Sequence, residues 1–285
     1  MRPLILACLG ITWFVWGSTY LAIKFALASF PPFFQMGTRF VIAGVLLMLW
    51  VGWRGQKLPT PVEWRNAAIV GALMLGGGMG GTAYAEQTVA SGLVVAFIAI
   101  TPALMTLASL PFGVRPTRLE LVGIGIGIAG VFLLTRGAGF VASPAGLVSI
   151  VIACVAWSLG SVFSQHVFPL ASSTTGIASE MFCGGVILMV LSVSVGETFD
   201  WPPQPQAAAA WLYLIVFGSL ISFYAYMVLL GNASPALASS YSFVNPIVAM
   251  LLGVSLGREA ITTYEWLVAC VIVFGVAVLV LGRRK

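Results

Sequence analysis

Residues 240–250 read "SYSFVNPIVAM" and lie inside a longer apolar run, residues 236–256. A run of about 20 apolar residues can cross the roughly 30 Å hydrocarbon core of a bilayer as a helix. Pro246 lacks the N–H that the helix needs there, which leaves the carbonyl of Ser242 without its helical donor. Hydrocarbon offers no water to that carbonyl, so it must face protein or a wet cavity. The stretch therefore predicts a membrane-spanning helix whose middle is either a packing kink or a working site.

Composition places the whole chain in a membrane. It has 285 residues, of which 60% are hydrophobic and 7% are charged, whereas a soluble domain carries roughly 25% charged residues. The formal charge of +5 comes from basic residues that gather near the ends of apolar runs. That distribution is typical of a topology signal rather than of nucleic-acid binding. The expected partners are the lipid bilayer and a small-molecule substrate, with no nucleic acid and no obligatory protein partner.

Ten apolar runs are long enough to cross the bilayer as helices. They are residues 4–27, 34–53, 65–85, 92–112, 119–135, 144–166, 174–195, 210–230, 236–256 and 263–281. The connections between them are short and rich in turn residues, which leaves no room for a soluble domain. We therefore expect an all-α membrane protein with ten transmembrane helices.

Basic residues predict how the chain is oriented. With the N-terminus inside, nine basic residues lie on the cytoplasmic side, namely Arg2, Arg54, Lys57, Arg65, Arg115, Arg118, Arg283, Arg284 and Lys285. Four lie on the other side, namely Lys24, Arg39, Arg136 and Arg258. Cytoplasmic loops carry the excess of lysine and arginine, so both termini are predicted to be cytoplasmic. The aromatic residues and Lys24 within the first run argue against a cleaved signal peptide.

An internal repeat divides the chain. Sliding it by 141 residues, with small gaps later on, aligns Trp16 with Trp157, Gly44 with Gly185, and Pro102 with Pro246. We place the two copies at 1–142 and 143–285. Each copy has five spans, an odd number, so the second copy must sit upside down in the membrane around a shared central cavity. Inverted repeats of this kind are typical of secondary transporters that alternate access around one site.

Two glycine-rich segments match the dinucleotide-binding pattern G-x-G-x-x-G, "GGGMGG" at 76–81 and "GIGIAG" at 125–130. Both lie inside apolar spans and neither follows a strand, so nucleotide binding is not predicted. Glycines four residues apart, such as Gly123 and Gly127, instead let helices approach closely. The four cysteines have no paired spacing, which predicts no disulfide framework and no metal site, and no cofactor is expected.

Aromatic and polar residues in several spans are candidates to line the cavity. Trp16, Tyr20 and Lys24 share one face of the first span, and the repeat places Trp157 and Ser161 on the corresponding face of the sixth. Both tryptophans lie about a dozen residues into their spans, so they either line a cavity or pack in the core. Tyr84 and Tyr226 align in the repeat, and each hydroxyl needs a partner, which could be a substrate or a neighbouring helix. The complete set of candidates is Trp16, Tyr20, Tyr84, Thr101, Trp157, Ser161, Tyr226, Ser242 and Asn245.

Charged residues within or near the spans are expensive in hydrocarbon, so each needs a partner or an exit. Lys24 and Glu86 could form a proton or charge gate, although Glu86 could also be an ordinary interfacial carboxylate. Arg39 is only about five residues into its span and is expected to reach the membrane edge with its long side chain. Glu180 is the repeat counterpart of Arg39, and the sequence does not indicate its role.

The two aligned prolines are candidate hinges. Pro102 lies in "AFIAITPALMT" (96–106) and Pro246 in the opening stretch. Symmetry-related prolines in the fourth and ninth spans predict paired hinges whose freed carbonyls, of Ile98 and Ser242, face the cavity. Static packing kinks are the alternative.

Several stretches resemble the EamA-type branch of the drug/metabolite transporter superfamily. They are "WGSTYLAIK" (16–24), "RFVIAG" (39–44), "YAEQTVASGL" (84–93), "NPIVAMLLGVSLGREAIT" (245–262) and "FGVAVLV" (274–280). The resemblance implies five plus five inverted helices, with spans 1, 3, 4, 6, 8 and 9 lining a cavity, spans 2 and 7 beside them, and spans 5 and 10 packed together. It also implies export of metabolites, for some members amino acids, across the plasma membrane or bacterial inner membrane.

The leading hypothesis is an alternating-access exporter of amino acids, aromatic or otherwise apolar, or of similar small metabolites. An aromatic cavity with neutral hydroxyls suits an apolar side chain with a zwitterionic end. The alternatives are a cation/multidrug or sugar-type exporter of the same fold, or a passive facilitator. Few clustered carboxylates and one histidine leave little for an enzyme to work with, so enzymatic activity is not predicted.

Overall fold

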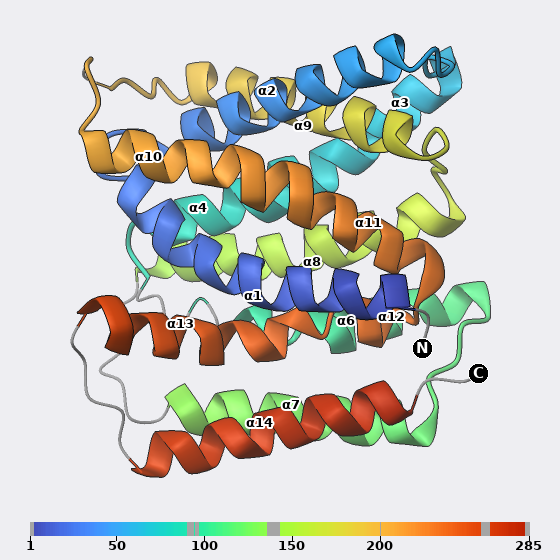
Figure 1. Ribbon diagram of the computed structural model, residues 1–285, viewed down its shortest axis with the longest axis vertical. Helices are drawn as coiled ribbons and strands as arrows, with labels where there is room; N and C mark the ends of the chain where they lie inside the picture. The colour runs from blue at the N-terminus through green and yellow to red at the C-terminus, as the bar shows by residue number, and fades with distance from the viewer. Residues whose placement is uncertain are drawn as a thin grey trace.

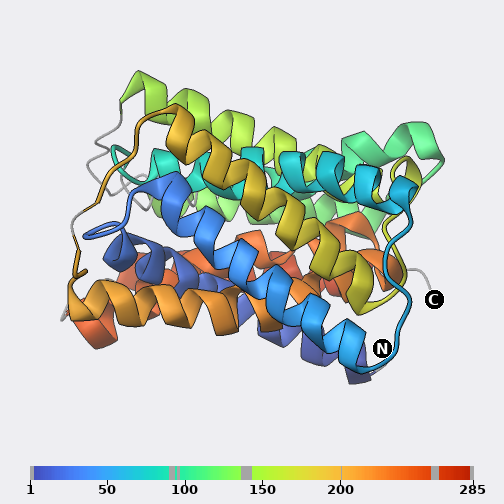
Figure 2. The same cartoon turned by 90° about the horizontal axis from the view of Figure 1, so that it is seen from above.

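The computed structural model describes residues 3–89, 94, 97–135, 143–199, 201–257 and 263–282. The described elements are helices that pass back and forth through one bundle, across the view in Figures 1 and 2. The first half comprises α1 (Pro3–Ala26), α2 (Pro32–Trp53), α3 (Pro61–Gly71), η1 (Ala72–Gly80), α4 (Gly81–Ala85), α6 (Thr101–Ser109), η2 (Leu110–Phe112) and α7 (Arg118–Thr135). The second half comprises α8 (Pro144–His166), α9 (Thr174–Ser194), α10 (Pro205–Tyr213), η3 (Leu214–Ile221), α11 (Ser222–Asn232), α12 (Pro235–Ala238), α13 (Tyr241–Gly257) and α14 (Thr263–Leu281).

Six of the described helical segments are long and apolar enough to cross a membrane. They are Pro3–Ala26, Pro32–Trp53, Pro61–Ala85, Pro144–His166, Thr174–Ser194 and Pro205–Asn232. The segments match the predicted first, second, third, sixth, seventh and eighth spans within a few residues. The end of α14 and the start of α1 lie at the same end of the bundle (Figure 1), as expected for a chain that crosses an even number of times.

The third and eighth spans share an unusual backbone. Each contains a stretch of π-helix, η1 in the third and η3 in the eighth, where the hydrogen bonds reach one residue further than in an α-helix. Such stretches are rare and frequently occur at functional sites. The two lie at corresponding places in the two halves, so the repeat predicted from sequence extends to a local distortion that the sequence pattern does not encode.

The fourth and ninth spans are interrupted. Pro102 stands in the first turn of α6, where a missing N–H breaks no helical hydrogen bond. In the ninth span α12 ends at Ala238, and the amide of Ser242 bonds the carbonyl of Ser239 at 3.1 Å. This tight turn separates α12 from α13, so the ninth span is two helices. The side chain of Pro246 lies outside the described side chains, and its backbone is helical.

Two pairs of helices pack with their backbones close together, α2 with α9 and α7 with α14, at opposite edges of the bundle (Figure 1). Glycines permit both contacts. A Cβ on Gly44 of α2 would stand 2.6 Å from the amide nitrogen of Phe182, and one on Gly123 of α7 would stand 2.8 Å from that of Leu279. The structure confirms the close-approach role predicted for Gly123, and it packs the fifth span on the tenth as the resemblance implies.

Candidate functional site

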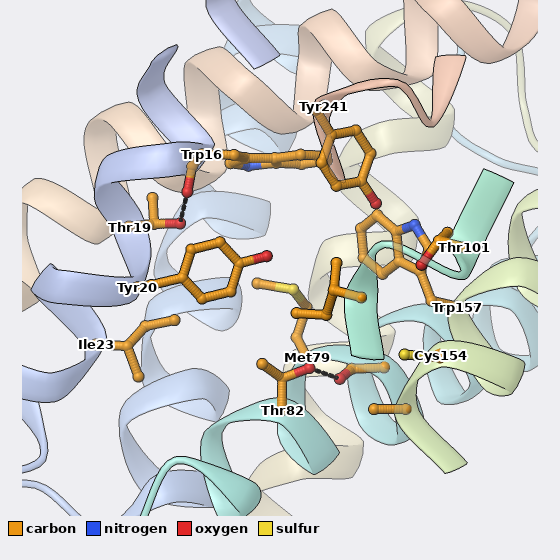
Figure 3. A pocket seen from close by; sticks show the side chains of 13 residues that line it. Trp16, Thr19, Tyr20, Ile23, Met79, Thr82, Thr101, Cys154, Trp157 and Tyr241 are labelled. Atoms are coloured by element: carbon orange, nitrogen blue, oxygen red, sulfur yellow. Dashed lines mark hydrogen bonds between the residues drawn. The ribbon is translucent and has the colours of Figure 1, made fainter. Parts of the chain in front are cut away.

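A pocket with about 520 Å³ of space, including its open mouth, lies between the two halves. Its lining comes from the second half of α1, from η1 and α4, from the start of α6, from the middle of α8 and from the first residue of α13 (Figure 3). The lining residues are Trp16, Thr19, Tyr20, Ile23, Gly78, Met79, Thr82, Ile98, Thr101, Ala153, Cys154, Trp157 and Tyr241. All of them are uncharged, and we call this cavity the first pocket.

Four aromatic side chains pack together at one wall of the first pocket, and we call them the aromatic layer: Trp16, Trp157 and Tyr241, which line the pocket, and Tyr226, which lies behind them. Trp16 stands edge-on to Tyr241, with ring centres 4.7 Å apart, and edge-on to Trp157 at 5.6 Å. Trp157 and Tyr226 follow at 5.2 Å. Edge-to-face contacts at these distances are favourable for aromatic rings. Figure 3 shows Trp16, Trp157 and Tyr241 turned toward the same space.

Hydrogen bonds fix the aromatic layer in place. The indole N–H of Trp157 donates to the Tyr226 hydroxyl at 3.1 Å, and that hydroxyl also bonds Ser161 at 2.8 Å. The indole N–H of Trp16 donates to the carbonyl of Gly218 in η3 at 3.1 Å. The π-helical stretch therefore presents a backbone acceptor to the layer. Buried tryptophan and tyrosine need such partners, and here the layer supplies them from within the protein.

A second pocket, with about 920 Å³ of space including its wide mouth, lies on the other side of the aromatic layer. Along α8, Cys154 and Trp157 line the first pocket, whereas Ser164 and Gln165 line the second. The second pocket is completed by the start of α9 and the end of α11. The aromatic layer thus separates two openings at opposite ends of the bundle.

Two charged residues flank the mouth of the first pocket. Lys24 is one helical turn beyond Tyr20 on α1, and Glu86 is one turn beyond Thr82, just past the end of α4. Side chains four residues apart on a helix share a face, so both point along the pocket wall. Neither carboxylate oxygen of Glu86 has a hydrogen-bond partner among the described residues. Burial raises the pKa of Glu86 well above its usual range, and the Lys24 ammonium opposes that rise.

The predicted site residues fall into several environments. Trp16, Tyr20, Thr101 and Trp157 line the first pocket. Ser161 and Tyr226 lie immediately behind it and hold the aromatic layer. The remaining three are placed as follows: Asn245 donates to the Tyr20 hydroxyl at 3.3 Å, Ser242 bonds the carbonyl of Ser239, and Tyr84 stacks on Phe33 at 5.9 Å, away from the lining.

The prediction omitted several lining residues. Thr19 and Thr82 are small, common residues that carry no signal of their own, although Thr19 is one turn from Trp16. Tyr241 lies in the opening stretch but is not among the residues that the sequence predicts. The register that aligns Pro102 with Pro246 also aligns Phe97 of the fourth span with Tyr241. This pair of aromatic residues is the sequence signal that could have identified Tyr241. The two aligned tyrosines differ, since Tyr226 is fully buried and Tyr84 is 39% exposed.

The position of Arg39 differs from the one predicted from the sequence. It was predicted to reach the membrane edge, but its side chain is 1% exposed, and its Nε donates to Ser219 of η3 at 2.6 Å. The prediction was wrong because α2 packs against η3 along the length that carries Arg39, which leaves no path to the headgroups. Its repeat counterpart Glu180 is also fully buried.

Comparison with known proteins decides the family. The model of the EamA-like transporter family matches the chain twice, at residues 3–136 and 144–281. The chain belongs to the EamA-like transporter family. A relative in Escherichia coli K12 described as the uncharacterized inner membrane transporter YedA is 41% identical over 270 residues, covering 94% of this chain and 88% of YedA. Protein PecM of Dickeya dadantii is 27% identical over 280 residues, covering 95% and 92%.

A solved crystal structure of a protein 23% identical in sequence shares the fold, with a TM-score of 0.79 over 99% of this chain and 98% of that one. This EamA-like chain is therefore an all-helical membrane protein with ten spans in two duplicated halves. As a member of a transporter family it is a membrane transporter and not an enzyme. The first pocket, which both halves line, is its candidate substrate site.

Proposed function

We propose that this EamA-like transporter exports amino acids, aromatic or other apolar ones first, or similar small metabolites, by alternating access. The observation that carries the proposal is the lining of the first pocket, which has no charged residue and combines aromatic rings with hydroxyl groups. Mostly apolar pockets with a few placed polar groups are typical small-molecule sites. An apolar side chain would lie against the aromatic layer, which offers edge and face contacts to it.

The polar groups of the site suit a zwitterionic end. Thr82 and Thr101 place hydroxyls on the first pocket. The buried Oδ1 of Asn245 has no hydrogen-bond partner among the described residues, so it is a ready acceptor for an ammonium group close to Tyr20. At the mouth, Lys24 would attract a carboxylate, and a bound ammonium group would stabilise the ionised form of Glu86. Together these groups favour a small zwitterion over a polyanion.

Alternating access would work through the aromatic layer and the interrupted spans. The layer closes the first pocket from the second, so transport requires it to part while the mouth near Lys24 and Glu86 closes. Pro102, at the start of α6, and Pro246, within α13, are the proposed hinges. The turn at Ser239, between α12 and α13, adds a further place where the ninth span can bend.

Topology completes the proposal. We place the two repeats at 1–142 and 143–285 and both termini in the cytoplasm, on the basic-residue asymmetry. YedA is described as an inner membrane transporter, which supports the plasma membrane or bacterial inner membrane as the location. In this orientation the first pocket opens outward and the second pocket opens to the cytoplasm.

The test is counterflow. Purified protein is reconstituted in liposomes that are preloaded with one unlabelled amino acid at a time, and uptake of the same labelled amino acid is followed without any gradient. Phenylalanine, tyrosine and leucine are expected to exchange well above protein-free liposomes. Exchange with none of the twenty amino acids, alongside robust exchange of a cation or a sugar, refutes the amino-acid proposal.

A cation exporter of the same fold is the second candidate, because one observation favours it. Glu86 is a buried carboxylate with no hydrogen-bond partner among the described residues, and an organic cation could neutralise it. The same liposomes, loaded with a quaternary ammonium compound, separate this candidate from the first. A passive facilitator differs only in that a proton gradient drives no accumulation.

A further inference from the structure

Glu180 in α9 is a buried acid that the proposed substrate site does not use. Its side chain is fully buried, and neither carboxylate oxygen has a hydrogen-bond partner among the described residues. An ionised carboxylate without partners is strongly disfavoured in such surroundings, which favour the neutral acid. Ionisable residues inside membrane spans are rare and mark ion or proton pathways more often than packing.

The repeat counterpart of Glu180, Arg39, has a polar side-chain partner in this bundle. Arg39 donates from Nε to the hydroxyl of Ser219 in the π-helical stretch of the eighth span. In the register that aligns Tyr84 with Tyr226, the third span has Gly77 where the eighth has Ser219. Glu180 therefore lacks the hydroxyl that its counterpart uses. Since Arg39 is engaged with η3, it does not neutralise Glu180.

The second pocket approaches Glu180 from one side. Gly176 and Ile177, which line that pocket, are four and three residues before Glu180 on the same face of α9. Helical side chains lean toward the N-terminus of their helix, so the carboxyl leans toward this pocket. Ser164 and Gln165 on the facing helix make the pocket polar enough to hold water.

On its other side Glu180 is near the aromatic layer, because α9 packs against α11, the helix that carries Tyr226. The hydroxyl of Tyr226 bonds Trp157 and Ser161. Trp157 lines the first pocket. A change of charge at Glu180 thus acts on the tyrosine hydroxyl that fixes the aromatic layer.

Few other ionisable groups face Glu180. The helices packed on α9 are α2, α3, η1 and α11. Their titratable side chains near the contact are Arg39, which is held by Ser219, and Tyr226, while Tyr224 of α11 lines the second pocket. Glu63 bonds Thr60 and Arg65 bonds Asn66 at the start of α3, and η1 has no titratable residue. Cys183, on α9 itself, is the remaining group in range.

We propose that Glu180 is the site that binds the coupling proton of this transporter. A proton that enters from the side of the first pocket adds to the carboxylate and forms the neutral acid, which allows the aromatic layer to close as observed. Release of that proton to water in the second pocket leaves a carboxylate near Tyr226, which weakens the closed layer and favours its opening. Each cycle therefore moves one proton from the side of the first pocket to the side of the second. The proposal rests on transport by alternating access, and the identity of the substrate does not enter it.

The first test measures transport and proton movement together. Liposomes carry an internal pH dye, and labelled phenylalanine is the probe. Wild-type protein is expected to accumulate phenylalanine under a pH gradient, up to about tenfold per pH unit for one proton per substrate, and to move protons when phenylalanine is added. Glu180→Gln is expected to keep gradient-free counterflow but to lose both the accumulation and the proton movement. Glu63→Gln, which removes an exposed carboxylate of α3, is the matched control and should behave as wild type.

The second test needs no substrate. Infrared difference spectra of the purified protein, recorded between acid and alkaline buffer, should show a carbonyl band of protonated carboxylic acids to which Glu180 and Glu86 each contribute a component. Glu180→Gln should lose the Glu180 component and Glu180→Asp should shift it, so a folding failure of one variant leaves the other. If wild type shows no amino-acid exchange, the substrate proposal fails while this band still tests Glu180.

Three results would overturn the proposal. They are an unchanged acid band in both variants, phenylalanine-linked proton movement in Glu180→Gln at the wild-type rate, and a folded Glu180→Gln that has lost counterflow as well. The last would show that Glu180 serves the exchange step or the fold rather than its coupling to protons.

Discussion

Replacing Tyr226 with phenylalanine tests the hydrogen bonds that hold the aromatic layer. The substitution keeps the ring and removes the hydroxyl that accepts from Trp157 at 3.1 Å and bonds Ser161 at 2.8 Å. Trp157 is 7% exposed, so its N–H would be left buried without an acceptor, at about 1–3 kcal/mol. The lost bond to Ser161 adds about 1 kcal/mol. The expected loss in the free energy of unfolding is therefore about 2–4 kcal/mol.

A double-mutant cycle with Ser161→Ala separates the bond from the side chains. Alone, Ser161→Ala should cost about 0.5–1.5 kcal/mol, because it removes one hydrogen bond. In the Tyr226→Phe background that bond is already gone, so the coupling energy should be about 1 kcal/mol. The assay is equilibrium unfolding in mixed micelles of dodecyl maltoside and sodium dodecyl sulfate, followed by tryptophan fluorescence. Additivity of the two changes within about 0.3–0.5 kcal/mol would refute the reasoning.

Four further substitutions test other parts of the bundle. Glu197→Ala should destabilise the protein by about 1–2 kcal/mol in the same unfolding assay, because its carboxylate accepts from two amides at the start of α2, at 3.0 and 2.8 Å. Gly44→Ala should cost about 1–3 kcal/mol by forcing a Cβ onto the backbone of Phe182, whereas Gly52→Ala on the same helix has no neighbour within 4 Å and should stabilise by about 0.5–1 kcal/mol. Pro102→Ala should leave folding unchanged and slow counterflow, and wild-type counterflow would contradict the hinge.

Hydrophobicity and the repeat were enough to predict the helical bundle. Apolar runs locate spans because a backbone in hydrocarbon must satisfy its own hydrogen bonds, which the helix does locally. The inverted repeat predicted a shared cavity, with the aligned Trp16 and Trp157 either lining it or packing in the core, and the structure brings both to the first pocket. Glycines in the fifth span predicted close helix packing for the same local reason, since a missing side chain is visible in the sequence itself.

The sequence did not predict what depends on contacts between distant helices. Arg39 is buried because it bonds Ser219 of η3, which is 180 residues away in the sequence. Tyr84 and Tyr226 align in the repeat, yet one stacks on Phe33 and the other holds the aromatic layer. Duplicated sequences start from the same environment, but each half packs against different neighbours, so equivalent residues acquire different roles. The interruption at Ser239 likewise arises from local hydrogen bonds that no hydropathy pattern records.

Protection of Cys154 by substrate tests the central claim that the first pocket holds the transported molecule. Cys154 lines this pocket, whereas Cys8 is buried outside the lining and Cys270 is exposed on α14. In a variant that keeps Cys154 as its only cysteine, the rate of labelling by a small thiol reagent is measured with and without an amino acid that shows counterflow. A variant that keeps only Cys270 is the control.

The account predicts that the exchanged amino acid slows labelling of Cys154 in proportion to its occupancy, that a non-exchanged one has no effect, and that Cys270 labels at one rate throughout. Equal labelling of Cys154 with and without a saturating, exchanged amino acid would contradict it.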